Sequence, residues 1–516
     1  MMTEAIQLPL YEEDQLELEY WDRILYHSMH HQINLGATGA GKTTAVESHI
    51  KGLIAEGWKV VIVYSPKKEI RTLALPEVWD ESLLDAMQRE GLTPEAFNVQ
   101  VKCPFFRSSA YYELENNEKK YLLPWMVDYF SIPVGLLNHE EIELLLIKSF
   151  SPSQRALIAA AQRVLVRDYG EDGTVFDLIR LCQSIANEGG VFLVQEDEEG
   201  NIEERMWFGM EAKKSLRSVA QSIIFPHEEG FISSGKSPHS LNLEEFINNT
   251  PQDCICAFEL GDVPYWEYIR CIVAFLSRKI FELKEMGRIK YNKICLVYLE
   301  LSNLVPAMNE PGGTIVKNTL VKIVQKGRQI GIKLLTDTQL PMEVDQRFLA
   351  QLRTKYVMRL NNRREYDALC QLIGEVLDRK DLRECNMLLE IGEGFLIDGG
   401  LMANDVVTFP PLTAHHLMEG ENFLEMLKYY TDKPMPIINQ TLIEYLNNGK
   451  TKGEDLIMPL KDVTDLVLAR QFNIEVEEQE GDPRDNKKVY ILDLRNTIDL
   501  QQREIKHLRE LLAEKQ

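Results

Sequence analysis

The chain has 516 residues, of which 45% are hydrophobic and 27% charged, and its formal net charge is −23. This composition is that of a soluble globular protein with several structural units. No run of about 18 uncharged apolar residues occurs, and the acidic start "MMTEAIQLPLYEED" does not fit a signal or transit peptide. The sequence therefore predicts a cytoplasmic protein without a membrane span.

The first predicted element is a short strand, "QINL" (32–35), which leads into the motif "GATGAGKTT". The motif fits G-x-x-x-x-G-K-[ST], with Gly36, Gly41, Lys42 and Thr43 in the fixed positions. The segment "TTAVESHIKGLIAEG" follows it and has the apolar spacing of a helix. Strand, loop and helix together predict a P-loop that binds ATP with Mg²⁺.

Each part of this loop has a chemical function. Glycines let the backbone curl so that successive N–H groups point at phosphate oxygens. In this motif the Lys42 ammonium reaches the β- and γ-phosphates, and the Thr43 hydroxyl is a ligand of Mg²⁺. The predicted nucleotide-binding residues are Gly36, Ala37, Thr38, Gly39, Ala40, Gly41, Lys42, Thr43 and Thr44.

Further along the chain, buried strands alternate with helical segments. The strand-like runs are "VVIVY" (60–64), "CICAFEL" (254–260), "KICLVYLEL" (293–301), "IKLLTDTQ" (332–339) and "KYVMRL" (355–360). Between the first two of these runs, the periodicity is mainly helical. The pattern predicts an α/β protein with a mainly parallel sheet and a large helical insertion.

Six segments follow from these patterns. We predict an N-terminal extension (1–31), two parts of a core (32–121 and 247–412) separated by a mostly helical insertion (122–246), a C-terminal extension (413–486) and a C-terminal helix (487–516). The last segment has an apolar 3-4 spacing that suits either a coiled coil that binds a protein partner or a helix packed on its own domain.

The eight cysteines are scattered, and several lie in the apolar runs. We predict reduced thiols in the core. Cys254 and Cys256 have the spacing of a metal-binding pair, but no second pair or nearby histidine accompanies them.

Polar residues at strand ends predict the second half of the ATP site. Glu300 ends "ICLVYLE", where P-loop enzymes place a catalytic carboxylate, and Gln339 ends "LLTDTQ", where a sensor could reach the γ-phosphate. Arg328, in "KGRQIGIK", is either an arginine finger supplied to a neighbouring subunit or a solvated arginine at a helix end. The predicted catalytic residues are Lys42, Glu300, Arg328 and Gln339.

These elements, in this order and spacing, resemble the HerA/FtsK superfamily of DNA-pumping ATPases, which includes conjugative and viral packaging ATPases. The similarity covers roughly 32–75 and 253–409, and its most specific part is 327–339. It implies a RecA-like core, a homo-hexameric ring with ATP sites shared between neighbours, and DNA threaded through the centre. On this resemblance Lys42 and Thr43 are Walker A residues, Glu300 the catalytic carboxylate, Arg328 the trans finger and Gln339 the sensor.

One departure from the family leaves two functions open. An Asp-Glu pair usually ends the Walker B strand, but here Leu299 precedes Glu300. Either Glu300 serves alone, another carboxylate substitutes, or hydrolysis is weakened. The sequence thus predicts an ATP-driven DNA translocase, with an ATP-binding scaffold of low catalytic activity as the alternative. A small-molecule kinase fits less well, because such enzymes seldom carry so large an insertion.

Charge is distributed unevenly along the chain. Residues 315–365 contain eleven Lys or Arg and four Asp or Glu, while two acidic runs, 195–204 and 475–482, are predicted to be solvated loops. DNA binding through the phosphate backbone needs basic surface. The predicted contacts are among Lys317, Lys322, Lys326, Arg353, Lys355, Arg363 and Arg364.

Overall fold

The computed structural model describes part of the chain between residues 23 and 414. The described residues are 23–66, 70, 73, 81–89, 91–104, 129–145, 152–187, 191–196, 202–207, 219–263 with short gaps, 265–308, 313–362, 364–366, 369–370, 386–399 and 401–414 with short gaps. All of them belong to the first of two units, Met1–Val467. The predicted C-terminal helix, the acidic run at 475–482 and Arg363 lie outside the described residues.

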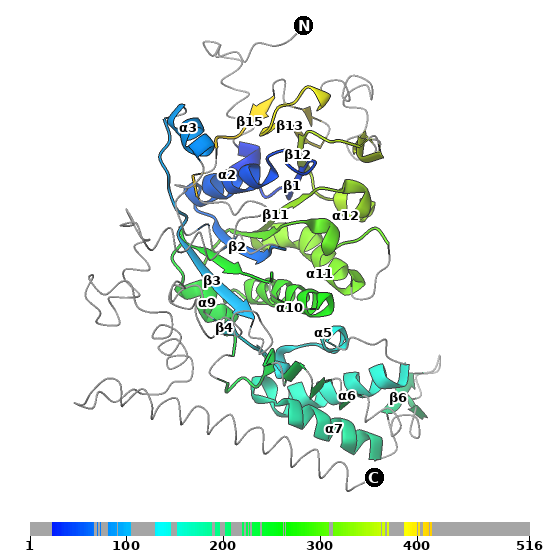
Figure 1. Ribbon diagram of the computed structural model, residues 1–516. Coiled ribbons are helices and arrows are strands. Elements are labelled where there is room, and N and C mark those ends of the chain that lie inside the picture. The colour runs from blue at the N-terminus through cyan, green and yellow to red at the C-terminus, as the bar shows by residue number, and fades with distance from the viewer. Residues whose placement is uncertain are drawn as a thin grey trace, which may run out of the picture. The chain divides into compact units, whose positions relative to one another are not determined.

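A sheet of eleven strands forms the centre of this unit (Figure 1). Its order is β14-β13-β12-β1-β11-β10-β2-β9-β3-β4, and β15 pairs with β13. From β12 to β4 all neighbours are parallel, whereas β13 is antiparallel to its partners. The predicted α/β fold with a mainly parallel sheet is confirmed.

The strands predicted from sequence all occur, with ends within three residues of the prediction. They are β1 (Gln32–Leu35), β2 (Lys59–Tyr64), β9 (Ile255–Phe258), β10 (Ile294–Tyr298), β11 (Ile332–Thr338) and β12 (Thr354–Met358). Every residue of these six strands is buried. Burial on both faces of a parallel sheet explains why their sequences are almost continuously apolar.

The remaining strands of the sheet were not predicted. They are β3 (Val99–Pro104), β4 (Tyr129–Phe130), β13 (Glu393–Asp398), β14 (Leu401–Met402) and β15 (Val407–Thr408). All five lie toward the two ends of the sheet, and three of them have only two residues, too few for a periodic signal.

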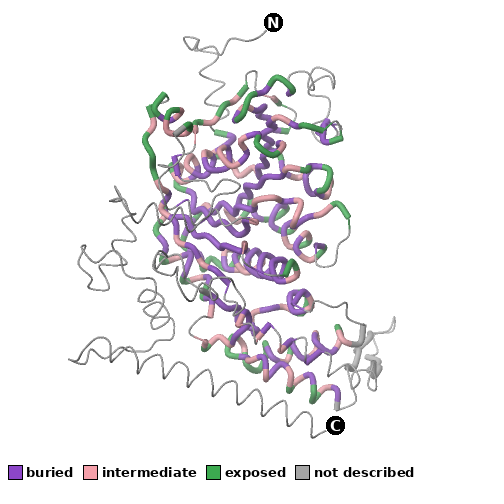
Figure 2. Tube along the Cα trace, in the orientation of Figure 1, coloured by how far each residue is buried: buried purple, intermediate pink, exposed green. Residues whose placement is uncertain are grey.

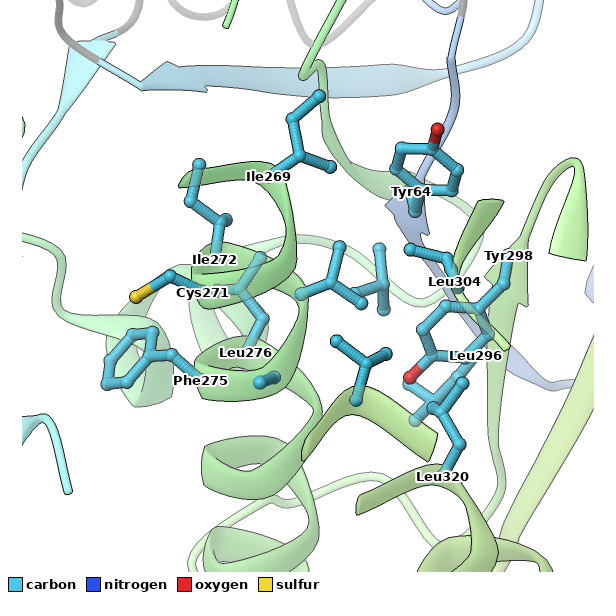
Figure 3. Packing of buried hydrophobic residues seen from close by; sticks show 14 of the residues in the cluster. Tyr64, Ile269, Cys271, Ile272, Phe275, Leu276, Leu296, Tyr298, Leu304 and Leu320 are labelled. Atoms are coloured by element: carbon cyan, nitrogen blue, oxygen red, sulfur yellow. The ribbon is translucent and has the colours of Figure 1, made fainter. Parts of the chain in front are cut away.

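Helices cover both faces of the sheet. On one face lies α2 (Lys42–Ala55), whose Val46, Ile50 and Leu53 pack with Val60, Val297 and Leu335 of the strands. On the other face lie α10 (Trp266–Glu285) and α11 (Gly313–Lys326), as Figure 3 shows for Leu276, Leu296 and Leu320. Figure 2 shows the buried strands between these layers. The other helices of the core are α3 (Glu81–Arg89), α9 (Leu243–Asn249) and α12 (Gln346–Leu349).

The segment between β3 and β9 contains helices and short strands. Besides α9, its described α-helices are α5 (His139–Leu144), α6 (Pro152–Asp168) and α7 (Val175–Asn187). Its described strands, besides β4, are β5 (Ile132–Pro133), β6 (Val191–Glu196), β7 (Ile202–Trp207) and β8 (Ile232–Ser233). Arg278 of α10 joins it to the core, because its guanidinium Nε donates to Glu141 Oε1 at 2.6 Å. The acidic run 195–204 was predicted to be a loop, but its ends pair in the antiparallel β6–β7 hairpin.

Two further predictions concern side chains. The seven cysteines in the described part of the chain are buried free thiols, as predicted, and burial raises the pKa of Cys254 to about 12. Within the described residues, no group of three or more His, Cys, Asp or Glu could hold a metal ion.

A search of the described helices for a membrane span found none with the length and apolar character that crossing a bilayer requires.

Candidate functional site: the carboxyl edge of the sheet

The P-loop connects the end of β1 to the start of α2. Gly41 immediately precedes α2 with φ 96°, a conformation that glycine adopts without strain. A Cβ on Gly41 would lie 2.8 Å from the backbone nitrogen of Gly392, so the loop also needs glycine for space. The first N–H groups of α2 have no partner within the helix and point toward this loop.

Neighbouring strands hold the loop in place. The N–H of Ala37 donates to the carbonyl of Arg359, just after β12, at 2.8 Å. The N–H of Gly392, before β13, donates to the carbonyl of Ala40 at 3.0 Å. Lys42 is 7% exposed, and its Nζ donates to the carbonyls of Gly36 and Ala37, both at 2.9 Å. The ammonium is thus positioned over the curl of the loop.

Glu300 lies two residues after β10, in a left-handed conformation with φ 51°. Among the described residues, Glu300 is the only one other than glycine that has a positive φ. Its Oε1 accepts hydrogen bonds from Ser302 Oγ at 2.7 Å, Thr338 Oγ1 at 3.1 Å and the backbone N–H of Gln339 at 3.2 Å. Three donors therefore fix the carboxylate that sequence predicts to be catalytic.

Gln339 connects Glu300 to the P-loop. The hydroxyl of Thr38 donates to Gln339 Oε1 at 2.6 Å, and the backbone N–H of Gln339 donates to Glu300. The connection exists because β11 lies between β1 and β10 and all three are parallel, so that their carboxyl ends meet at one edge. The structure therefore brings Lys42, Glu300 and Gln339 to one site.

Tyr64, the last residue of β2, lies beside Glu300. Its hydroxyl accepts a hydrogen bond from Asn303 Nδ2 at 3.3 Å. Burial raises the pKa of Tyr64 above its ordinary value, and the negative charge of Glu300 adds to this rise. The phenol therefore remains protonated at neutral pH.

Arg328 lies elsewhere. It is exposed in the short helix η8 (Gly327–Ile330), which precedes β11, whereas Gln339 follows β11. A seven-residue strand spans about 23 Å at about 3.3 Å per residue. Burial lowers the pKa of His31, which precedes β1, and the charge of Arg328 adds to this fall, so both residues lie at the amino edge of the sheet. Within this chain, Arg328 is remote from its own P-loop.

The predicted DNA-contacting residues differ in exposure. Lys322, Lys326 and Arg364 are exposed. Lys317 is bound to Asp345, with Nζ to Oδ2 at 3.0 Å, and Arg353 Nε donates to Asp398 at 3.0 Å.

Lys355 does not fit the prediction. It is 4% exposed within β12, and its Nζ donates to the carbonyl of Leu352 at 2.7 Å. Burial lowers its pKa to about 8. A buried ammonium of this kind is unsuited to contact DNA phosphates, so this prediction is wrong for Lys355.

Three further residues at this edge were not predicted from sequence. Asp337, the penultimate residue of β11, accepts the backbone N–H of Glu300 at its Oδ1, 2.6 Å away. Ser302 donates to Glu300, and the Arg359 carbonyl holds the P-loop. The alternation of "LLTDTQ" could have indicated Asp337, because every second residue of a strand lies on the same face.

The residues present fit a nucleotide with Mg²⁺. The loop offers backbone N–H groups and the Lys42 ammonium to phosphates, while Thr43, in the first turn of α2, offers a hydroxyl to Mg²⁺. Mg²⁺ keeps several waters and uses few protein ligands, so a three-residue acidic cluster is not required. Near the loop, Asn34 is 1% exposed, and neither atom of its amide has a hydrogen-bond partner among the described residues.

No protein-family model and no curated protein sequence matches the chain. Among solved structures, VirB4 of Thermoanaerobacter pseudethanolicus is similar, with 14% sequence identity, a TM-score of 0.46 and coverage of 74% of this chain and 90% of that chain. The plasmid coupling protein TrwB in complex with the non-hydrolysable ATP analogue ADPNP shares 11% identity, with a TM-score of 0.43 and coverage of 75% of this chain and 86% of that chain.

A third similar structure is the genome packaging NTPase B204 from Sulfolobus turreted icosahedral virus 2 in complex with AMP. It shares 12% identity, with a TM-score of 0.23 and coverage of 34% of this chain and 73% of that chain. The chain is similar to conjugative and viral packaging proteins. At such identities the similarity concerns the fold alone.

Proposed function

We propose that this chain is an ATP-driven DNA translocase of the cytoplasm that works as a homo-hexameric ring. The observation that carries the ATPase part is the hydrogen-bonded chain from Thr38 through Gln339 to Glu300. It couples the phosphate-binding loop, after β1, to a carboxylate that follows β10, two strands away. A loop that only bound nucleotide would not need this coupling.

Each residue has a distinct function in this proposal. Lys42 neutralises charge on the β- and γ-phosphates, and Thr43 holds Mg²⁺, which supplies further positive charge to the same phosphates. Glu300 orients the attacking water and accepts its proton, while its Oε1 is held by three donors. Gln339 senses the phosphates through Thr38, so that their presence or loss changes the position of the Glu300 carboxylate.

The position of Arg328 supports the proposed ring. A guanidinium is the usual partner of the transferred phosphoryl group, and it can come from a neighbouring subunit. Arg328 is exposed and remote from its own P-loop. An exposed arginine at the amino edge of one sheet can reach a site at the carboxyl edge of the next subunit's sheet. Shared sites of this kind close into a ring.

Exposed lysines support DNA as the translocated substrate. Lys322 and Lys326 lie on α11, next to Arg328, and both are exposed. They provide positive charge at this surface, although the whole chain has a net charge of −23. Contacts between lysines and phosphates are independent of base sequence and weaken with salt. Such contacts suit a motor that moves along DNA of any sequence.

A scaffold that binds ATP without efficient hydrolysis remains the second candidate. Leu299 favours it, because its half-buried side chain packs with the apolar residues under α2 where an aspartate is usual. The two functions differ in one measurable property. DNA stimulates the ATPase of a motor, whereas a scaffold binds ATP with negligible turnover.

The experiment uses the full-length protein. Steady-state ATP hydrolysis is measured with and without double-stranded DNA of mixed sequence, in 50 and 200 mM salt, and particles with ATP and DNA are imaged. We expect DNA-stimulated hydrolysis, affinity that falls with salt, and six-fold rings. The charge reversals Lys322→Glu and Lys326→Glu together should lower DNA affinity, while Lys236→Glu, at an exposed lysine of the insertion, serves as the control. Turnover that DNA does not change would contradict the motor.

A further inference from the structure

The carboxylate missing at Leu299 has a counterpart on the adjacent strand. Side chains of β11 alternate between the faces of the sheet. Leu335 packs with Val46 and Ile50 of α2, whereas Leu334 packs in the cluster of the opposite face. Asp337 follows Leu335 by two residues and therefore lies on the α2 face. Leu299 packs with the same α2-face cluster.

Asp337 is also at the right end of the sheet. α2 begins beyond the carboxyl end of β1 and runs back over the sheet, so its first turn, with Thr43, covers the carboxyl ends of the strands. β11 is the direct neighbour of β1. Asp337 is thus one strand closer to the P-loop strand than Leu299, and it faces the turn that carries the predicted Mg²⁺ ligand.

A buried, unpartnered amide marks the same place. Asn34 of β1 lies in register with Asp337 of β11 and with Tyr356 of β12. Tyr356 packs with Ala45 of α2, which places Asn34 on the α2 face as well. Asn34 is 1% exposed, and its amide oxygen and nitrogen have no hydrogen-bond partner among the described residues. A buried polar group without a partner is costly, and a bound hydrated cation would satisfy it.

We propose that Asp337, assisted by Asn34, orders the water ligands of the nucleotide-bound Mg²⁺ in place of the carboxylate that Leu299 lacks. The inference rests on the proposed nucleotide site and assigns a positioning residue to it. Asp337 acts in two directions: its Oδ1 holds the backbone N–H of Glu300, and its charge attracts the cation. One side chain thereby aligns the metal with the catalytic carboxylate.

The test separates these two actions with Asp337→Asn. Asparagine has the same size and keeps an oxygen that can accept the Glu300 N–H, but it removes the charge. Binding of a fluorescent non-hydrolysable ATP analogue to the full chain is measured in EDTA and across a Mg²⁺ titration, and Mn²⁺ binding is followed by EPR. Asp253→Asn, at an exposed aspartate, is the matched control.

We expect Asp337→Asn to bind the analogue in EDTA as the wild type does, while the Mg²⁺ concentration for half-maximal enhancement rises about 10- to 100-fold, the usual cost of losing an outer-shell partner. An unchanged Mg²⁺ requirement would overturn the inference while leaving the proposed function intact. A wild-type chain that does not bind the analogue would overturn both. Glu47→Gln tests a competing buried carboxylate on α2, and a shift in that variant alone would also overturn the inference.

A second variant does not depend on the folding of the first. Leu299→Asp places a carboxylate at the usual position in an otherwise unchanged chain. If Asp337 already supplies this charge, the Mg²⁺ requirement should change by less than about threefold. A tenfold or greater gain in Mg²⁺ affinity would show that the site lacked a carboxylate and would overturn the inference. In the double variant, Leu299→Asp should recover most of the affinity lost with Asp337→Asn.

Discussion

Glu300→Gln separates the chemical function of this side chain from its structural one. Glutamine keeps an oxygen that can accept from Ser302, Thr338 and the Gln339 N–H, but the acceptor is neutral. Hydrogen bonds to charged groups contribute about 1 kcal/mol more than neutral ones. Three such bonds put the loss at no more than about 3 kcal/mol, so a domain of ordinary stability stays folded.

The expected loss of activity is larger. Removing a catalytic base slows the chemical step by about 10²- to 10⁴-fold, which corresponds to about 3 to 5 kcal/mol of activation free energy. We therefore expect Glu300→Gln to bind ATP with near wild-type affinity, to hydrolyse it at least about 100-fold more slowly, and to stall on DNA.

The assay combines nucleotide binding, thermal unfolding and single-turnover hydrolysis with and without DNA. Glu343→Gln, at an exposed glutamate after β11, is the control and should retain wild-type rates. If Glu300→Gln hydrolyses ATP as fast as the wild type, Glu300 is not the base and the scaffold becomes the better description. If the activity of Glu300→Gln falls only in proportion to the fraction of protein that is folded, the function of the Glu300 side chain is structural.

Three other predictions concern nucleotide, assembly and pH. Lys42→Ala should abolish hydrolysis, because the β- and γ-phosphates lose their ammonium partner, and unchanged turnover would refute the ATPase. Arg328→Ala should still bind ATP and should inhibit wild-type subunits when mixed with them, whereas a linear decline with mutant fraction would contradict shared sites. Burial lowers the pKa of His49 to about 3, so the unfolded chain takes up a proton below pH 6.5 that the folded chain refuses, and stability falls as the pH falls. Between pH 7 and pH 5 this proton uptake should lower the free energy of unfolding by about 2 kcal/mol. Chemical unfolding should show that this pH-dependent loss is absent from His49→Leu but present in a control variant at the exposed His139.

The sheet could be predicted from sequence where strands are buried on both faces. Such strands are continuous apolar runs, and the P-loop fixes the place of β1 among them. The antiparallel edge was missed. β13 reads "EGFLID", a six-residue run with a glycine inside it, and its partners β14 and β15 have two residues each. Short edge strands carry too few side chains for periodicity to show.

The candidate site was predictable strand by strand but not across strands. Glu300 and Gln339 could be named as candidates because each ends a strand, and parallel strands bring such ends together. Asp337 was missed because its importance depends on which face α2 covers, and that is a property of the packing. The buried state of Lys355 was missed for the same reason, since a lysine within a strand gives no sign of the layer above it.

The backbone conformation of Glu300 favours the motor over the scaffold. A non-glycine residue in the left-handed region costs about 1 to 2 kcal/mol, and Glu300 is held there by Asp337, which accepts its N–H, and by three donors to its carboxylate. The same strand end could relax at no loss if the protein only bound ATP. Strain that four hydrogen bonds maintain, at the edge where the P-loop and Gln339 meet, is instead what positioning a reactive carboxylate requires. The position of Asp337 extends the argument, because a charge at one point in space serves the metal equally well from either of two adjacent strands. On this proposal, the charge that Leu299 lacks comes from Asp337 on the next strand, and the proposed site then holds the groups that hydrolysis requires.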